Sequence, residues 1–153
     1  MRRILALLVA MACTACLPTR AVAPAPLSFH ASRSVKEATQ VAAVSLINAG
    51  FRVTQTDSIG QALTASRTAT HNGNDQYVTC DAAKGSAAAA NRETTLTIDF
   101  KASPSASGSD VRIESRVRTS YPGYVGTSME TPPNETDCVS NGVMEQQLAA
   151  ALR

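Results

Sequence analysis

Two alternating stretches of the chain decide its fold: residues 94–101 read TTLTIDFK, and residues 110–119 read DVRIESRVRT. Apolar and polar side chains that alternate with a period of two predict a strand with one buried face. The side chains expected to face the interior are Leu96, Ile98, Phe100, Val111, Ile113 and Val117. Residues 103–109, which read SPSASGS, are expected to be the hairpin connection between these two strands.

A second, shorter hairpin is predicted upstream. Residues 51–57 read FRVTQTD and alternate in the same way, residues 58–60 are expected to turn, and residues 61–68 return as a strand. Residues 76–80 are expected to add a short strand. Three segments rich in turn-forming or small residues are expected to be loops or loose turns: 69–75, 81–92 and 121–137.

Helices are predicted on both sides of these strands in the sequence. Over residues 33–50, Ser34 and Glu37 have the spacing of a capping box, and Gly50 is a natural stop. The apolar side of this helix is expected to hold Val35, Ala38, Val41, Ala42, Val44, Leu46, Ile47 and Ala49. A final helix is expected from about Ser140 to the end of the chain. Its apolar side is expected to hold Val143, Met144, Leu148, Ala151 and Leu152.

This order of elements predicts a single α+β domain over residues 33–153. An antiparallel sheet with one apolar face needs a cover, and two helices with apolar sides can supply it. We therefore expect a two-layer sandwich, in which an antiparallel sheet of about four strands has the N- and C-terminal helices packed on one face.

The N-terminus has the layout of a secretory signal peptide, expected over residues 1–15. Arg2 and Arg3 precede an apolar run that ends in small residues. The small residues before Cys16 resemble the bacterial lipobox, in which such a cysteine becomes lipid-modified and N-terminal after cleavage. Cys13 is the alternative lipidation site, and an ordinary secreted protein with two incidental leader cysteines is the other interpretation.

Residues 16–32 are expected to be the lipidated cysteine and a proline-rich tether, because three prolines between Leu17 and Ser28 do not allow a helix. A first strand here is the alternative. Leu17 after the modified cysteine, rather than Asp, resembles an outer-membrane address, so we expect a lipid-anchored protein that faces the periplasm. A surface-exposed or secreted protein is the alternative. The chain has 14 basic and 12 acidic side chains, so removing Arg2 and Arg3 leaves 12 of each. This balance argues against nucleic acid as a partner.

Two cysteines remain after the leader, Cys80 and Cys138. An exported protein folds in an oxidising compartment, so a disulfide is expected, and it would close a loop of 58 residues, 138 minus 80. A metal site and a catalytic thiol are the rival interpretations. Neither cysteine has a second cysteine or histidine at ligand spacing, so we expect no metal and no cofactor.

Two surfaces are candidates for interaction. Arg112, Arg116 and Arg118 alternate along one strand and are expected to face solvent, where they could meet acidic partners or lipid headgroups. Glu114 and the neighbouring Asp99 are expected to neutralise part of this row. Downstream, Tyr121 and Tyr124 are the aromatic residues of an irregular segment, and exposed aromatics favour interfaces. Packing of these tyrosines over the sheet edge is the alternative.

The residues also resemble a known family. The residues that carry the first match are Ala49, Gly50, Phe51, Val53, Asp57, Gly60 and Ala65. They are similar to the pattern of helix-grip lipoprotein domains, which include lipoprotein C of the outer-membrane barrel-assembly machine (the BamC-like family). The segment 138–145, CVSNGVME, resembles the start of the last helix in small lipoproteins of this kind. The resemblance implies a helix-grip fold and says little about function, since a fold does not fix function.

Three functions follow as hypotheses. The first is a non-enzymatic, membrane-anchored envelope accessory that acts as a protein-interaction module, possible partners being the membrane and an envelope protein. The second is a periplasmic module that binds a lipid or a small molecule between the sheet and the helices. The third is a hydrolase that uses His71, with Asp75 or Asp81 as the orienting acid. His30 is expected to end the tether, and no Gly-x-Ser-x-Gly motif is present, so we predict no enzyme.

Overall fold

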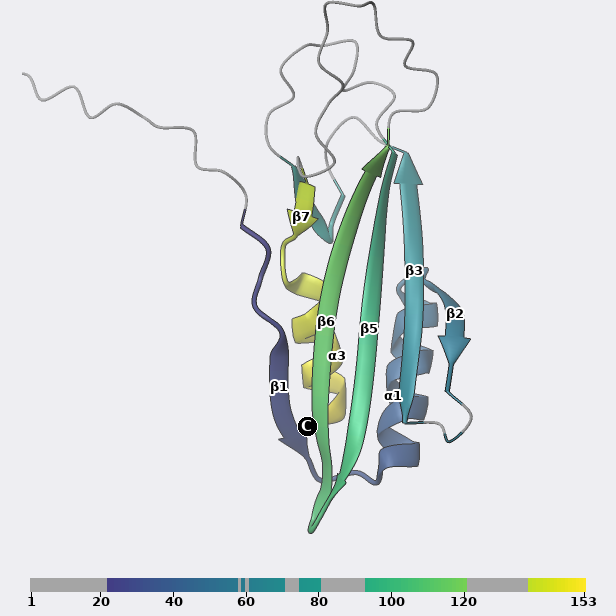
Figure 1. Ribbon diagram of the computed structural model, residues 1–153, viewed down its shortest axis with the longest axis vertical. Helices are drawn as coiled ribbons and strands as arrows, with labels where there is room; N and C mark the ends of the chain where they lie inside the picture. Colours follow the sequence, from purple (N-terminus) through teal and green to yellow (C-terminus); the bar gives the residue numbers. More distant parts are fainter. Residues whose placement is uncertain (1–21, 58, 60, 71–74, 81–92, 121–137) are drawn as a thin grey trace, which may run out of the picture.

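The structure is a computed structural model of the 153-residue chain, and it describes residues 22–57, 59, 61–70, 75–80, 93–120 and 138–153. Its elements are, in chain order, β1 (Leu27–Ala31), α1 (Val35–Asn48), β2 (Arg52–Thr56), β3 (Ala62–Thr70), β4 (Val78–Cys80), β5 (Glu93–Ser105), β6 (Gly108–Ser120), β7 (Cys138–Ser140) and α3 (Val143–Leu152). The main sheet has five strands in the order β1-β6-β5-β3-β2, and β4 and β7 pair as a separate ribbon (Figure 1). The predicted α+β class with an antiparallel sheet is confirmed, and the estimate of about four strands was too low.

Strands β5 and β6 form the long central hairpin of the sheet. They pair antiparallel from Glu93 opposite Ser120 to Ser105 opposite Gly108, so only Ala106 and Ser107 form the turn. The prediction of a connection over residues 103–109 was therefore wrong. Pro104 is tolerated in the strand because its position needs no N–H donor. The N–H of Ala102 points toward β3 and donates to the carbonyl of Gln61 at 2.8 Å. The nitrogen of Pro104 points the same way, but it lies beyond the end of β3.

Strand β1 contains residues that were predicted to belong to the tether. It pairs antiparallel with β6, with Leu27 opposite Ile113 and Ala31 opposite Ser109. The prolines come just before this strand, at positions 18, 24 and 26, and Leu27, Phe29 and Ala31 alternate toward the core. The strand alternative was therefore the correct one for residues 27–31, and the tether stays a prediction for the residues before them.

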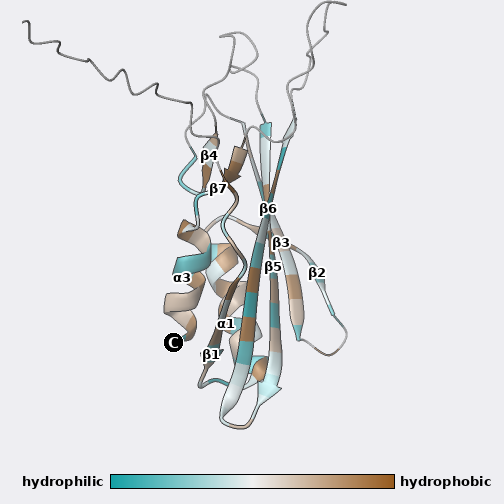
Figure 2. Ribbon diagram, turned by 60° about the vertical axis from the view of Figure 1, so that its left-hand side comes forward, coloured by the Kyte–Doolittle hydropathy of each residue, from teal (hydrophilic) through white to brown (hydrophobic). Residues whose placement is uncertain are grey.

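Both helices lie on the same face of the sheet and contact each other (Figure 2). Helix α1 buries Ala38, Ala42 and Leu46, and the two alanines let its backbone lie close to the sheet. Helix α3 buries Met144, Leu148 and Leu152 among its apolar residues. Together with the inward side chains of the strands, these residues form one continuous core. The predicted two-layer arrangement is thus present.

The two ends of α1 match the sequence prediction, but its apolar side is narrower. The Ser34 hydroxyl accepts a hydrogen bond from the backbone N–H of Glu37, and the Glu37 carboxylate accepts from the Ser34 N–H, which makes the predicted capping box. Val44 and Ile47, predicted to extend the buried side, are 57% and 56% exposed. The helical period places both on the side of α1 that is turned away from the buried Ala38 and Ala42, and so away from the sheet.

Candidate functional site

Several predicted site residues lie outside the part of the chain that the structure describes: Cys13, Cys16, His71, Asp81, Tyr121 and Tyr124. Their roles stay predictions. The described residues that carry polar or reactive chemistry fall into four groups, which are the disulfide ribbon, a buried ion pair, the outer face of the sheet and a cluster at the β5–β6 turn.

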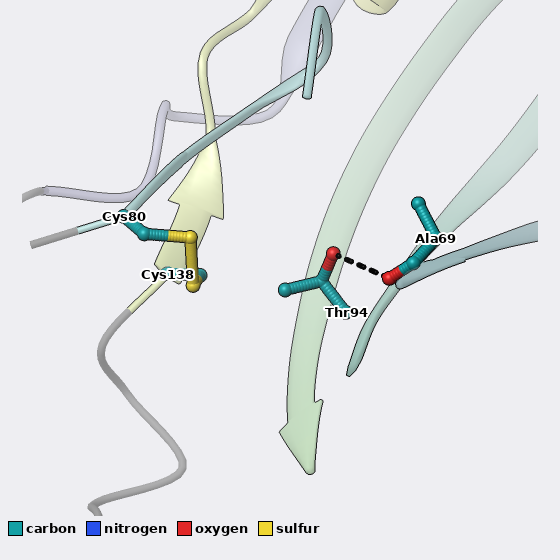
Figure 3. The surroundings of a disulfide bond; sticks show 4 residues. All are labelled: Ala69, Cys80, Thr94 and Cys138. Carbon is teal, nitrogen blue, oxygen red and sulfur yellow. Dashed lines mark hydrogen bonds between the residues drawn. A yellow bond between two sulfur atoms is a disulfide. The ribbon is translucent and has the colours of Figure 1, made fainter. Parts of the chain in front are cut away.

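The disulfide ribbon contains the bond between Cys80 and Cys138. Cys80 in β4 lies directly opposite Cys138 in β7, and their sulfur atoms are 2.09 Å apart (Figure 3). Beside the bond, the Thr94 hydroxyl donates to the carbonyl of Ala69 at 3.5 Å. The bond therefore ties the segment before α3 to a strand that is 58 residues away in the sequence. A disulfide was predicted from the compartment, and its role here is to hold the fold together.

The segment that continues from the disulfide starts α3. The Ser140 hydroxyl donates to Oε1 of the buried Glu145 at 2.7 Å and accepts from the N–H of Gly142 at 3.2 Å. Gly142 has φ +82°, a left-handed conformation that suits glycine. The residues of this segment therefore have a structural role, because they close the ribbon and begin the helix. Among the described residues, Oε2 of Glu145 has no hydrogen-bond partner.

A partly buried ion pair that the sequence did not predict lies near the same end of the sheet. Both oxygens of Asp75 accept hydrogen bonds from Arg67, at 2.9 and 3.1 Å, and the Asp75 side chain is only 6% exposed. The Arg67 guanidinium lies 5.2 Å from the ring centre of Tyr77, which packs against Phe51. Asp75, a candidate orienting acid for His71, is thus held by Arg67. The pair lets an arginine occupy an inward position of β3, opposite Leu96.

The outer face of the sheet carries the predicted arginine row. Arg112, Arg116 and Arg118 are exposed on β6. Arg116 binds Asp99 of β5, and Arg112 lies 3.4 Å from Glu114, so the predicted partial neutralisation is confirmed.

Hydroxyl groups fill much of the remaining outer face. They belong to Thr64, Ser66, Thr68, Thr95 and Thr97, at outward register positions of β3 and β5. Some bond to one another or to the charges, as Thr68 does with Thr95 at 2.9 Å and Thr64 with Asp99 at 2.8 Å. This face is therefore polar, uncovered by the helices and ordered by its own hydrogen bonds.

The fourth group combines a serine, a histidine and an aspartate at the opposite end of the sheet from the disulfide. His30 in β1 lies opposite Asp110 in β6, and its Nδ1 is 3.1 Å from Asp110 Oδ1. Its other ring nitrogen, Nε2, is 3.1 Å from the hydroxyl of Ser107 in the hairpin turn. His30 therefore lies in a strand, and the prediction that it ends a tether was wrong. The alternation in residues 27–31 could have shown that His30 is an outward residue of a strand, but not that it meets Ser107 and Asp110.

The approach of the hairpin turn to β1 depends on a glycine. A Cβ atom at Gly108, where φ is +151°, would lie 2.1 Å from the carbonyl oxygen of Ala31. The next residue, Ser109, is buried and donates its hydroxyl to the carbonyl of Arg33 at 3.0 Å. These contacts fix the turn against the segment that follows β1, and so they bring Ser107 within hydrogen-bonding distance of His30.

One carboxyl group near this end has a shifted pKa. The hydrogen bond from the Ser34 hydroxyl, and after it the one from the Ser34 N–H, lower the pKa of Glu37 below its usual value. Both bonds belong to the cap of α1, so this shift reports helix capping rather than catalysis.

The chain matches no protein-family model, and a search of curated proteins finds no match to its sequence. The resemblance to helix-grip lipoproteins therefore stays an expectation. Within the described ranges, no group of three or more His, Cys, Asp or Glu side chains is placed to hold a metal ion. None of the described helices is long and apolar enough to span a membrane.

Proposed function

We propose that the protein is an exported lipoprotein, anchored through Cys16 to the outer membrane, whose domain recognises an envelope protein with the outer face of its sheet. The observation that carries this proposal is the polar outer face itself, in which hydroxyls and paired charges are held in place by hydrogen bonds. Polar groups ordered before binding favour specific recognition, because less conformational freedom is lost in the complex.

The position of β1 supports a domain that works close to a membrane. Ten residues, 17–26, separate Cys16 from the first strand. A fully extended chain spans at most about 3.5 Å per residue, so this tether reaches about 35 Å. A lipid on Cys16 would therefore keep the domain within a few nanometres of the bilayer, where envelope proteins are its neighbours.

The packed core favours recognition by the surface over ligand binding inside. The space between sheet and helices is occupied by buried side chains from both layers, among them Phe100, Ile98, Leu46 and Leu148. A module that holds a lipid between its layers needs room there. The small-molecule alternative is therefore the weaker one.

Two experiments test the two parts of the proposal. For the anchor, the full-length protein is expressed in a bacterium, and the membrane fraction is analysed by mass spectrometry. We expect diacylglycerol on Cys16. We also expect the Cys16→Ala variant to be released from the membrane, while Cys13→Ala stays bound. If Cys16→Ala stays in the membrane fraction and Cys13→Ala is released, the lipidated residue is Cys13. If both variants stay in the membrane fraction, lipidation of either cysteine is contradicted.

For the interaction, a photo-crosslinking residue replaces Arg118 on the outer face in cells. The matched control replaces Gln40, an exposed residue on the helical side of the domain. We expect a discrete crosslinked envelope protein from position 118 and none from position 40. Equal crosslinking from both positions, or none from position 118, would contradict the assignment of this face.

A further inference from the structure

We propose that Ser107, His30 and Asp110 form a hydrolytic triad that cleaves small acyl esters. The three side chains come from two elements, the β5–β6 hairpin and β1, and both of their hydrogen bonds measure 3.1 Å. A nucleophile within hydrogen-bonding distance of a base, which is oriented by a third group, is the arrangement that activates a serine. This activity goes beyond the proposed interaction role and does not depend on it.

The order of the contacts assigns each proton. An ionised carboxylate can only accept a hydrogen bond, so Nδ1 of His30 must donate to Asp110. The neutral ring then has its lone pair on Nε2, which accepts the hydroxyl proton of Ser107. The aspartate thus fixes the tautomer in which the imidazole acts as a base toward the serine.

The reaction closes with water as the only co-reactant. Ser107 Oγ attacks the ester carbonyl carbon while its proton passes to Nε2 of His30. When the tetrahedral intermediate collapses, the carbon–oxygen bond to the alcohol breaks, and the alcohol leaves with the proton from Nε2. Water then attacks the acyl-serine and gives its proton to Nε2. The carboxylic acid is released, and Ser107 recovers its proton.

The exposure of the site selects its substrates. The side chains of His30 and Asp110 are 44% and 67% exposed, so the triad stands on an open surface. An open surface gives little binding energy for orienting a substrate. The ester should therefore have a small acyl group and a good leaving group, and it can be carried on a large molecule that would not enter a pocket.

Covalent labelling is the decisive test, because it identifies the nucleophile. The full-length protein in detergent is treated with a biotinylated fluorophosphonate, and the modified residue is located by peptide mass spectrometry. We expect the label on Ser107 and its loss in His30→Gln. The control is Ser105→Ala, which removes another serine of the same hairpin and should label normally. Absence of label from Ser107, or labelling that survives His30→Gln, would overturn the triad.

Hydrolysis of 4-nitrophenyl acetate gives a second readout. An exposed histidine alone can attack this ester, so the informative variant is Ser107→Ala, which keeps the ring. We expect kcat/KM to fall at least tenfold in Ser107→Ala and to stay at the parent value in Ser105→Ala. An unchanged kcat/KM in Ser107→Ala would show that the ring acts without the serine and would overturn the proposal. Neither result depends on lipidation or on crosslinking from position 118, so the two proposals fail separately.

Discussion

The two ends of the sheet are fastened in different ways. At one end, the Cys80–Cys138 bond joins β4 to β7, and Arg67 holds the buried Asp75 nearby. At the other end, where the β5–β6 hairpin turns (Figure 1), β1 pairs with β6 through its backbone, and the side-chain contacts of His30 with the hairpin are exposed hydrogen bonds. Covalent bonds and buried ion pairs cannot easily exchange partners, whereas exposed polar groups can. We therefore infer that the disulfide end secures the fold and that the hairpin end is available for chemistry.

Loss of the disulfide should have the largest effect of any change at either end. Closing a loop of 58 residues restricts the unfolded chain, and the chain-entropy relation gives about 4 kcal/mol for this length. We expect the Cys80→Ser/Cys138→Ser variant to lose about that much free energy of unfolding in a denaturant titration. The parent protein under a strong reductant is the control and should lose a similar amount. If the free energy of unfolding is the same with and without the bond, the inference that the disulfide end secures the fold is wrong.

The ion pair at the same end should give the next largest effect. In Asp75→Ala the Arg67 guanidinium, which is 26% exposed, loses its charge partner, so we expect a loss of about 2 to 3 kcal/mol. The double variant Arg67→Met/Asp75→Ala should recover part of this loss, because it leaves no unpaired charge next to the rings of Tyr77 and Phe51. Additive losses in a double-mutant cycle, measured by denaturant unfolding, would show that the pair is not coupled.

The sequence predicted the centre of this fold better than its margins. The strands around Leu96 and Ile113 and the helix from Ser34 follow from local periodicity and capping, which a single segment displays. Strand β1 was missed because its prolines suggested a tether, and its pairing with β6 lies about 80 residues away in the sequence. Strand β7 has only three residues, too few to show a period.

The candidate site was predicted less completely than the fold, for the same reason. The disulfide could be predicted by counting the cysteines. The outward position of the arginines could be predicted from the alternation of the strand. The contact between His30 and Ser107 requires that β1 be paired with the hairpin, so no local pattern contains it. The inward position of Arg67 could not be predicted from the sequence either, because it is stable only when Asp75 and Tyr77 lie around the guanidinium.

Gly108→Ala tests how closely the hairpin end must approach β1. The added Cβ would lie 2.1 Å from the Ala31 carbonyl, so the backbone must shift, and we expect a cost of about 2 kcal/mol in thermal or denaturant unfolding. The matched control is Gly142→Ala, which has a left-handed φ but nothing within 4 Å of the new atom. Its loss should be smaller, about 1 kcal/mol. Equal losses would mean that conformation alone, and not the approach to β1, explains the glycine.

The smallest expected effect concerns the helix cap at the hairpin end, and it depends on pH. The hydrogen bonds from Ser34 lower the pKa of Glu37 in the folded state below its value in the unfolded chain. A carboxyl group whose pKa is lower in the folded state stabilises the fold at every pH above its pKa in the unfolded chain. This stabilisation is lost as the pH falls through the pKa of the folded state. Because Glu37 is fully solvent-exposed, the contribution should be small. Glu37→Gln keeps a side-chain oxygen that can accept the hydrogen bond from the Ser34 N–H, but the amide cannot titrate. The difference in unfolding free energy between parent and variant should therefore shrink between neutral pH and pH 3, while Lys36→Gln, an exposed neighbour outside the cap, shows no such convergence.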